Sequence, residues 1–280
     1  MTIAAGFCCD DGVLLCSDSQ ETLGDFKRNQ AKITVKPEYR EPASCRAVFA
    51  GAGDSTFIDI VVQKLWDAIR SETGNIDDFI RALEDRAIAI HQRYWPVYTE
   101  KDRPTAHLLI ALCCKDWPLK LLRVEGPLVL EITGYDCVGY GVPLAKYLCD
   151  RMWEIPMSLK PTLFVALYML EQVKQHAEYC GGHSAFTLIQ KDGKVRTATR
   201  IYPSVNAELV SYFEEFDEAV ALLLAAGPNL EITSEKYDER LSAFSERMRN
   251  LRRQFRSLNT LNKITLKDLT TEWEFRDIPF

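Results

Sequence analysis

The sequence lacks any apolar run long enough to span a bilayer, and its start lacks the basic and apolar regions of a secretory signal peptide. Asp10 and Asp11 stand where such a peptide would be apolar. A basic surplus is also missing, since 34 Lys and Arg stand against 40 Asp and Glu, for a net charge of −6. These absences argue against a membrane or a nucleic acid as partner, and they predict a cytoplasmic protein.

The cysteine spacing lacks the patterns of a metal site and of a disulfide framework. The nine cysteines are odd in number, form no C-x-x-C pair and lie mostly inside apolar runs. The four histidines do not complete a metal-ligand spacing with them. We therefore predict buried free thiols, no metal and no cofactor.

The chain has 280 residues, 47% of them hydrophobic, and contains no internal repeat or low-complexity segment. That is enough for one large domain or two small ones. The hydrophobic patterns predict strands within residues 2–49, two helices within 54–96, strands within 107–139, two helices within 143–179 and strands within 185–200. This order predicts an α+β fold in which two antiparallel sheets pack face to face, with a helix pair on each outer face.

We place a first domain at residues 2–204 and a helical extension at 205–280. A helix over residues 206–225 is expected to end before Gly227-Pro228. The apolar residues that then recur at spacings of four and three, as in a heptad seam, are Tyr237, Leu241, Phe244, Met248, Leu251, Phe255 and Leu258. Such a seam suits packing on the chain's own domain or docking on a neighbouring subunit. The aromatic tail, TTEWEFRDIPF, is expected to dock as well.

Thr2 directly follows Met1, a setting in which methionine aminopeptidase usually removes the methionine. The mature chain would then begin with a hydroxyl and a free α-amine on one residue, a nucleophile with its own base. Many ordinary proteins also start Met-Thr, so the dipeptide alone assigns no role. A turn at residues 10–12 pairs positions whose numbers add to about 20–22, which predicts that Asp18 lies within reach of Thr2.

Three short stretches stand out: DSQETLG at residues 18–24, Lys32-Ile33, and AGAGD at residues 50–54. Together they resemble the proteasome β-subunit family of N-terminal-nucleophile hydrolases. Gln20 with Thr22-Leu23-Gly24 is especially similar to the bacterial, ATP-dependent relative in that family. The resemblance spans residues 2–200 and implies a four-layer αββα sandwich, the same architecture that the element order predicts.

The resemblance also implies roles for seven residues. Thr2 matches the catalytic threonine, Asp18 the buried aspartate, Lys32 the active-site lysine and Gly51 the glycine whose N–H forms the oxyanion hole. The substrate-binding positions that it implies are Thr22 and Gly53, which pair with a substrate strand, and Phe49, the floor of the primary specificity pocket.

These residue types suit the chemistry. An α-amine has a pKa of about 7.7–8.0 and can serve as the base. A lysine cation beside it lowers that pKa, and a buried lysine needs a carboxylate partner, which Asp18 supplies. A glycine N–H can approach a developing oxyanion closely. Taken singly, Asp18 could merely end a strand and Lys32 could be a solvated lysine, but their joint spacing behind Met1 favours a site.

Three supporting positions depart from the family's pattern. Tyr140 stands between two glycines where a serine is usual. Ala177 and Cys180 stand where an aspartate and a serine are usual, ahead of a double glycine. The usual residues hydrogen-bond to the threonine amine and to each other, so we expect the amine to be oriented differently here.

We predict a threonine-type peptidase that cleaves peptide or unfolded-protein substrates bound as an added β-strand. The resemblance implies a homo-oligomeric ring and allows an ATP-dependent unfoldase as partner. Two alternatives stay open: an amidohydrolase of the same fold that acts on a small amide, and a non-catalytic scaffold subunit.

Overall fold

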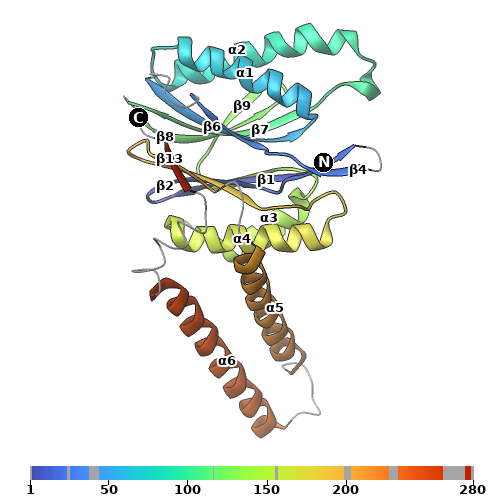
Figure 1. The fold of residues 1–280 in the computed structure, drawn as a ribbon, viewed down its shortest axis with the longest axis vertical. Coiled ribbons are helices and arrows are strands. Elements are labelled where there is room, and N and C mark those ends of the chain that lie inside the picture. The colour runs from blue at the N-terminus through green and yellow to red at the C-terminus, as the bar shows by residue number, and fades with distance from the viewer. Residues whose placement is uncertain are drawn as a thin grey trace. The chain divides into compact units, whose positions relative to one another are not determined.

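The computed structural model describes residues 2–23, 26–37, 44–115, 117–154, 157–198, 203–226, 233–260 and 275–278. It divides the chain into two compact units, Met1–Arg200 with Phe275–Phe280, and Ile201–Glu274. Figure 1 shows the sheets and four helices of the first unit and the two long helices of the second.

A six-stranded antiparallel sheet contains the N-terminal strand. Its order is β10-β1-β2-β11-β12-β13. The strands are β1 Ile3–Cys9, β2 Gly12–Ser17, β10 Tyr135–Gly139, β11 Ala185–Gln190, β12 Val195–Ala198 and β13 Phe275–Ile278. Strands β1 and β2 form the predicted hairpin, with Cys9 opposite Gly12 and Ala4 opposite Ser17. This register brings Thr2 level with the residues that follow β2.

A five-stranded antiparallel sheet has the order β5-β6-β7-β8-β9. Its strands are β5 Ile33–Lys36, β6 Cys45–Gly53, β7 Ala106–Cys114, β8 Trp117–Glu125 and β9 Leu128–Ile132. A two-stranded ribbon, β3 Gln20–Leu23 with β4 Phe26–Asn29, lies between β2 and β5 in the chain. Ala4 and Leu15 of the first sheet share a buried cluster with Val48, Ala50 and Leu109 of the second, so the two sheets pack on each other.

Two helix pairs cover the sheets. Helices α1 Ser55–Ser71 and α2 Ile76–Tyr94 contact strands β6, β7 and β9, whereas α3 Val142–Met152 and α4 Leu159–His176 contact β10, β1 and β2 (Figure 1). Asp54 caps α1 by accepting from the Phe57 N–H, and Asn75 forms a capping box with Asp78 on α2. Two short 3₁₀ turns, η1 Trp95–Val97 and η2 Glu100–Asp102, precede β7.

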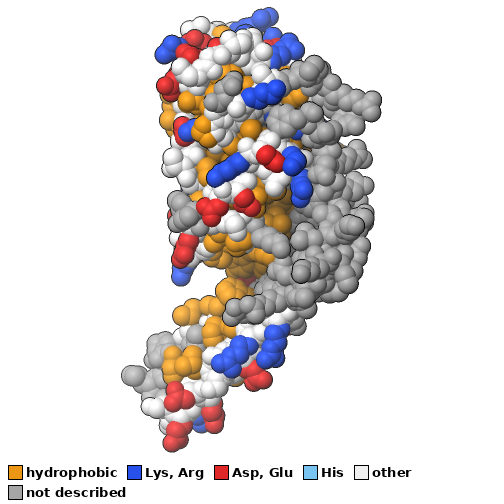
Figure 2. All heavy atoms as spheres, turned by 90° about the vertical axis from the view of Figure 1, so that its left-hand side faces the viewer, with side chains coloured by type: hydrophobic (Ala, Val, Ile, Leu, Met, Phe, Trp, Pro, Cys, Tyr) orange, Lys and Arg blue, Asp and Glu red, His pale blue; other side chains and the backbone are white. Residues whose placement is uncertain are grey.

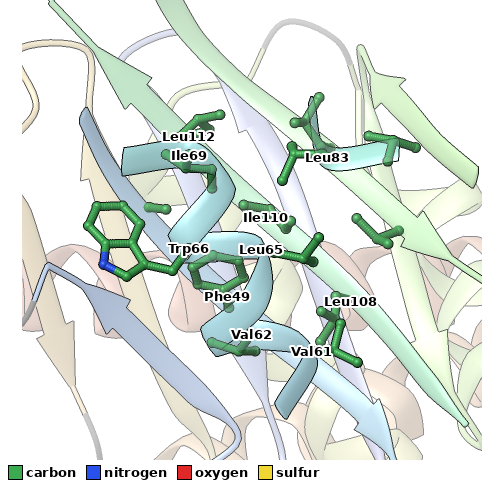
Figure 3. Close-up of a cluster of buried hydrophobic side chains, with 14 of the residues drawn as sticks. Phe49, Val61, Val62, Leu65, Trp66, Ile69, Leu83, Leu108, Ile110 and Leu112 are labelled. Atoms are coloured by element: carbon green, nitrogen blue, oxygen red, sulfur yellow. The ribbon is translucent and has the colours of Figure 1, made fainter. Parts of the chain in front are cut away.

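The α1–α2 face of the second sheet carries a large hydrophobic core (Figure 3). Alternation along β6 decides its composition, because Ala47 and Phe49 point to the helices while Val48 and Ala50 point to the first sheet. Each fully buried Leu, Ile or Phe side chain stabilises the fold by about 1.5–3 kcal/mol. The α+β class with antiparallel sheets, predicted from the element order, is confirmed.

On the face that Figure 2 shows, the Lys and Arg side chains of the described residues are interspersed with Asp and Glu and form no gathered basic patch among them. Within the described ranges, no helix is both long enough and apolar enough to cross a bilayer.

The second unit is a pair of long helices in contact with each other, α5 Pro203–Ala226 and α6 Ser234–Thr260. Arg247 of α6 forms an ion pair with Glu218 of α5, at 2.6 Å. In the heptad seam, Tyr237, Leu241, Phe244 and Met248 of α6 are half-buried or exposed. The side chains of Leu251, Phe255 and Leu258 lie outside the described residues, so the partner of the seam stays a prediction. Part of the tail, Phe275–Ile278, forms β13 and pairs with β12.

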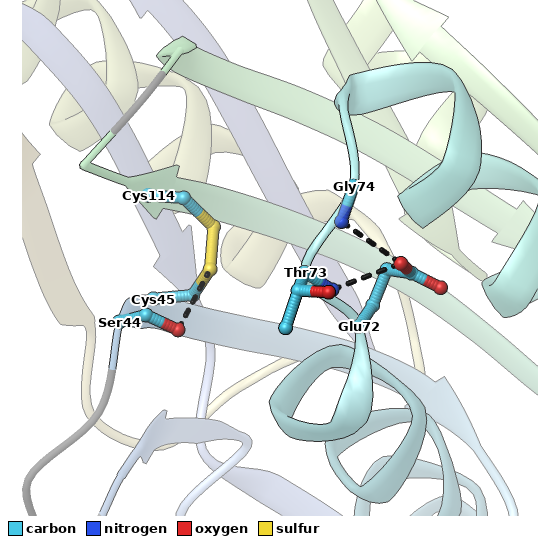
Figure 4. Close-up of a disulfide and its surroundings, with 6 residues drawn as sticks. All are labelled: Ser44, Cys45, Glu72, Thr73, Gly74 and Cys114. Carbon is cyan, nitrogen blue, oxygen red and sulfur yellow. Dashed lines mark hydrogen bonds between the residues drawn. A yellow bond between two sulfur atoms is a disulfide. The ribbon is translucent and has the colours of Figure 1, made fainter.

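A disulfide joins Cys45 to Cys114 across β6 and β7 (Figure 4). The prediction of free thiols is therefore wrong for these two residues, while the other cysteines in the described ranges are free. The physical reason is the strand register, which places Cys45 directly opposite Cys114 with their Cα atoms 4.0 Å apart. Their separation of 69 residues in the sequence hides this proximity.

Candidate active site

Thr2, Asp18 and Lys32 meet at the start of β1. Thr2 is 3% exposed and Asp18 is fully buried. The Thr2 hydroxyl donates to Asp18 Oδ1, and Lys32 Nζ donates to Thr2 Oγ1. Lys32 Nζ also lies 2.7 Å from Asp18 Oδ1. The β1–β2 hairpin positions Thr2 and Asp18, and Lys32 lies directly before β5 in the chain.

Backbone groups support both ends of this ion pair. Asp18 accepts hydrogen bonds from the N–H of Ile3 at 3.1 Å and of Gly181 at 2.9 Å. Lys32 donates to the carbonyl of Gln20. Buried charges are tolerated when they are paired and hydrogen-bonded in this way. Burial lowers the pKa of Lys32 below its usual value, although the Asp18 carboxylate opposes the shift.

Cys180 packs near the same charges without acting as a thiolate. Burial, and next the Asp18 carboxylate, raise the pKa of the Cys180 thiol to about 12, with Lys32 opposing. A thiol with that pKa is protonated near neutral pH and is a poor nucleophile. The hydroxyl of Thr2, to which Lys32 Nζ donates, is therefore a better candidate nucleophile than the Cys180 thiol.

Gly51 lies in β6 beside the site, but its N–H is already bonded. It donates to the Lys32 carbonyl at 3.1 Å, as part of the pairing between β5 and β6. A Cβ at this position would lie 2.8 Å from Leu108 Cδ2 and 3.1 Å from Ile58 Cγ2, so a larger residue would crowd its neighbours. An oxyanion would have to share or displace this hydrogen bond.

The predicted substrate-binding residues are placed unequally around Thr2. Gly53 ends β6, is exposed and has a φ of 136°, and a Cβ there would lie 2.2 Å from the Thr105 carbonyl oxygen. Thr22 is half-buried in β3, opposite Lys27 of β4. Gly53 thus lies at a strand end that borders the site, and Thr22 lies on the ribbon that borders it through Gln20 and Glu21.

Phe49 lies away from these residues. Its side chain is 1% exposed and packs in the core beneath α1, against Val62 and Leu65 (Figure 3). The alternation of β6 turns it toward the helices, so it does not line the hollow beside Lys32. Gln20 and Glu21 of β3 and Ile58 of α1 line that hollow instead. No sequence pattern predicts Ile58 in this lining, because its position depends on how α1 packs on the sheet.

Of the positions that depart from the family pattern, Tyr140 contacts Thr2 through the backbone. The Tyr140 N–H donates to the Thr2 carbonyl oxygen at 2.7 Å. Gly139 has a φ of 109°, and a Cβ there would lie 2.2 Å from that same oxygen. Ala177 ends α4 as its C-cap, and Gly181 beyond it supplies the N–H that binds Asp18.

Two hollows flank Thr2. One, of about 50 Å³, contains Lys32 and Gly51 in its lining. The other, of about 500 Å³, is lined by residues of β7, β8, β10 and α3 together with Gly53. None of the described residues forms a cluster of His, Cys, Asp and Glu that could hold a metal ion.

No protein-family model matches the sequence, and no curated protein sequence matches it. Solved structures of Anbu are similar in fold. The Gly-1 mutant from Hyphomicrobium sp. strain MC1 has a TM-score of 0.66 at 15% identity, covering 83% of this chain and 100% of that one. Anbu (ancestral beta-subunit) from Yersinia bercovieri has a TM-score of 0.63 at 16% identity, covering 82% and 100%. The helical assembly of the Anbu complex from Pseudomonas aeruginosa has a TM-score of 0.64 at 14% identity, covering 84% and 99%.

These similarities correct the interpretation of the sequence as a bacterial-type proteasome β-subunit. The fold is similar to that of Anbu, named as an ancestral beta-subunit, and the similarity extends to the fold alone. The short stretches at residues 18–24 and 50–54 lie beside Thr2 in the fold, but they do not assign the chain to one branch of that fold.

Proposed function

We propose that the protein is an N-terminal-nucleophile hydrolase that cleaves amide bonds with Thr2, made the first residue by removal of Met1. The observation that carries the proposal is the buried cluster in which Lys32 Nζ and Asp18 both bond the Thr2 hydroxyl. A hydroxyl held by a lysine cation is activated because the cation stabilises the negative charge that builds on the oxygen. The proteasome-like fold supports the same reaction class.

In the proposed reaction, Thr2 Oγ1 attacks the substrate carbonyl carbon while its proton passes to the α-amine of the same residue. The C–N bond of the tetrahedral intermediate then breaks, and the α-amine returns the proton to the leaving nitrogen. The acyl group remains as an ester on Thr2. The same amine deprotonates a water molecule, which hydrolyses the ester and restores the hydroxyl. Lys32 stays a cation and Asp18 a carboxylate throughout.

We infer that the substrate is a peptide or an unfolded protein, bound as an extended strand between Thr22 and Gly53 on a four-layer αββα frame. In this role Gly51 donates to the oxyanion once its hydrogen bond to the Lys32 carbonyl is shared. Homo-oligomeric assembly is supported by the helical assembly reported for Anbu from Pseudomonas aeruginosa. A ring and an ATP-dependent unfoldase partner are the corresponding proposals for this chain.

One observation favours a second candidate, an amidohydrolase that acts on a small amide. The hollow beside Lys32 measures only about 50 Å³, which limits the acyl group that it can hold. Comparing extended peptides with acetyl and propionyl amides separates the two candidates, because only the peptidase gains rate from residues beyond the scissile bond.

The test is an intact mass of the purified protein before and after incubation with a peptide epoxyketone. This reagent forms a ring with the hydroxyl and the amine of one N-terminal residue. We expect loss of Met1 and one adduct on Thr2, retained in Thr2→Ser and absent in Thr2→Ala. Retention of Met1 in the native protein would contradict the mechanism and favour a scaffold subunit.

A further inference from the structure

The larger hollow beside Thr2 shares Gly53 with the proposed pairing of the acyl portion, but the residues that it takes from β7, β8, β10 and α3 have no role in that pairing. Its volume of about 500 Å³ lies within the range of small-ligand sites, whereas the hollow beside Lys32 is about 50 Å³. Thr2 lines both, so a substrate that reaches across the nucleophile enters the larger hollow on one side of the scissile bond.

The charged residues in that lining are mostly cationic. Arg123 of β8 and Lys146 of α3 face a single carboxylate in the lining, Glu125, and His107 of β7 adds a further basic side chain. Arg123 and Lys146 outnumber Glu125 among the charged residues of the lining itself.

A buried carboxylate behind the lining fixes the two cations. Asp136 of β10 is 6% exposed and does not line the hollow. It lies 2.8 Å from Arg123 Nη1 and 2.8 Å from Lys146 Nζ. Burial would raise the pKa of Asp136, but hydrogen bonds from Lys146, the Cys137 N–H and Arg123 hold it below its usual value. The two cations are therefore held in place before any ligand arrives.

Arg123 retains hydrogen-bonding capacity. Its Nη2 donates to Glu125 at 2.5 Å, and its buried Nε has no hydrogen-bond partner among the described residues. Nη1 and Nη2 each carry a second N–H that the bonds to Asp136 and Glu125 do not use, and an anionic group in the hollow would accept from them. Planar carboxylates are the groups that a guanidinium pairs with best.

A backbone hydrogen bond connects one lining residue of the hollow directly to Thr2. Tyr140 lines it, and its N–H holds the Thr2 carbonyl oxygen at 2.7 Å. The Tyr140 ring is half exposed and packs edge-on against Tyr179, with ring centroids 4.8 Å apart. A group bound between this ring and the cations would therefore lie directly beside the scissile bond.

We propose that this hollow is a leaving-group subsite that takes a carboxylate-bearing residue immediately after the scissile bond, recognised by Arg123 and Lys146. The assignment to the leaving-group side rests on the proposed function, in which the acyl portion pairs with Thr22 and Gly53. The protein then selects substrates mainly by the acidic residue that follows the cleaved bond.

The first experiment measures hydrolysis of peptides that differ only in the residue after the scissile bond, which is Glu, Gln or Lys. Mass spectrometry locates the cleavage. We expect kcat/KM for the Glu peptide to exceed that for the Gln peptide by about tenfold, the size expected for one charge-assisted hydrogen bond. In Arg123→Gln, and in the milder variant Lys146→Gln, the kcat/KM values for the Glu and Gln peptides should differ by no more than about twofold. Arg81→Gln, an exposed charge change on α2, should leave the preference for the Glu peptide unchanged.

The second experiment removes any dependence on turnover. Thr2→Ala is titrated calorimetrically with the same Glu and Gln peptides, alone and combined with Lys146→Gln. Tighter binding of the Glu peptide that disappears with Lys146→Gln supports the subsite even if the native protein forms no epoxyketone adduct. Equal affinities, including no measurable binding of either peptide, overturn it. A Thr2 adduct formed at the normal rate together with equal affinities would leave the proposed function standing without this subsite.

Discussion

Lys32 and Asp18 form a nearly buried ion pair in which each partner depends on the other. The Lys32 side chain is 10% exposed and that of Asp18 is fully buried. Lys32 donates to Thr2, Asp18 and the Gln20 carbonyl, which uses the three donors of an ammonium group. Removing either charge would leave the other buried without compensation.

Asp18→Asn should therefore destabilise the fold as well as stop the reaction. Loss of one partner of a buried pair typically costs about 3–5 kcal/mol. Urea denaturation measures the change in the free energy of unfolding, with Asp59→Asn, an exposed carboxylate on α1, as the control. A loss no larger than that of Asp59→Asn would show that Lys32 does not need this carboxylate.

The reaction should also fail at high pH, because Lys32 must carry its proton to donate to Thr2 Oγ1. Burial lowers the pKa of Lys32 from 10.5, and Asp18 opposes the shift. The cation is therefore lost below the pH at which an ordinary lysine titrates, and activity falls as pH rises through that lowered pKa. The rate of epoxyketone labelling across alkaline pH measures this, and a rate that stays constant up to pH 10.5 would contradict it.

At the scale of single elements, the end of β10 sets the position of Thr2. Gly139→Ala would bring a Cβ within 2.2 Å of the Thr2 carbonyl oxygen at a φ of 109°. We expect Thr2 to shift and labelling to fall by at least about tenfold, since small displacements of reacting groups cost about that much or more.

Gly126→Ala is the matched control. Gly126 also has a positive φ, 58°, but no atom lies within 4 Å of an added Cβ. Gly126→Ala therefore has the cost of about 1–2 kcal/mol for a left-handed backbone, without the steric clash that Gly139→Ala creates. Equal labelling rates in the two variants would show that the approach of β10 to Thr2 is not required.

The disulfide between β6 and β7 should stabilise the sheet beneath α1. It closes a loop spanning 69 residues, for which the chain-entropy relation predicts roughly 4 kcal/mol. Cys45→Ala with Cys114→Ala should lower the urea midpoint strongly, whereas Cys113→Ala removes a neighbouring free thiol and should cost less. If reduction of the native protein leaves the midpoint unchanged, the cross-link contributes nothing under those conditions.

At the scale of the whole molecule, the chain leaves the first unit after β12 and returns to it as β13. Ala198 lies opposite Phe275 in the antiparallel pair. A short Gly-containing turn in place of residues 199–274 should therefore close a direct β-hairpin. We expect this variant to fold and to label at Thr2, while truncation after residue 198 exposes the edge of β12 and promotes aggregation. Light scattering and epoxyketone labelling of both variants measure this, and equal aggregation would contradict it.

The sequence predicts the parts of this molecule that depend on short chain separations. The turn at residues 10–12 brings Thr2 to Asp18, and the two helices expected within residues 54–96 form as α1 and α2. Features that depend on the register between distant strands are not predictable in this way. The disulfide and the Gly51–Lys32 hydrogen bond both follow from the pairing of β6 with its neighbours.

The sequence does not predict the orientation of Phe49 or the lining of the larger hollow, for the same reason. Both depend on which face of a strand meets which layer, and the hollow assembles residues from β7, β8, β10 and α3. Strand alternation alone shows that Phe49 and Val48 face opposite ways, but not which of them faces the helices.

The return of the chain as β13 also fixes the order in which the protein is completed during translation. The sheet that holds Thr2 gains its last strand only after both helices of the second unit have been synthesised, because β13 follows them in the chain. Until then β12 is the edge of that sheet on the ribosome, with unpaired backbone groups open to other nascent chains. Thr2 is thus synthesised well before β13, the strand that completes its sheet.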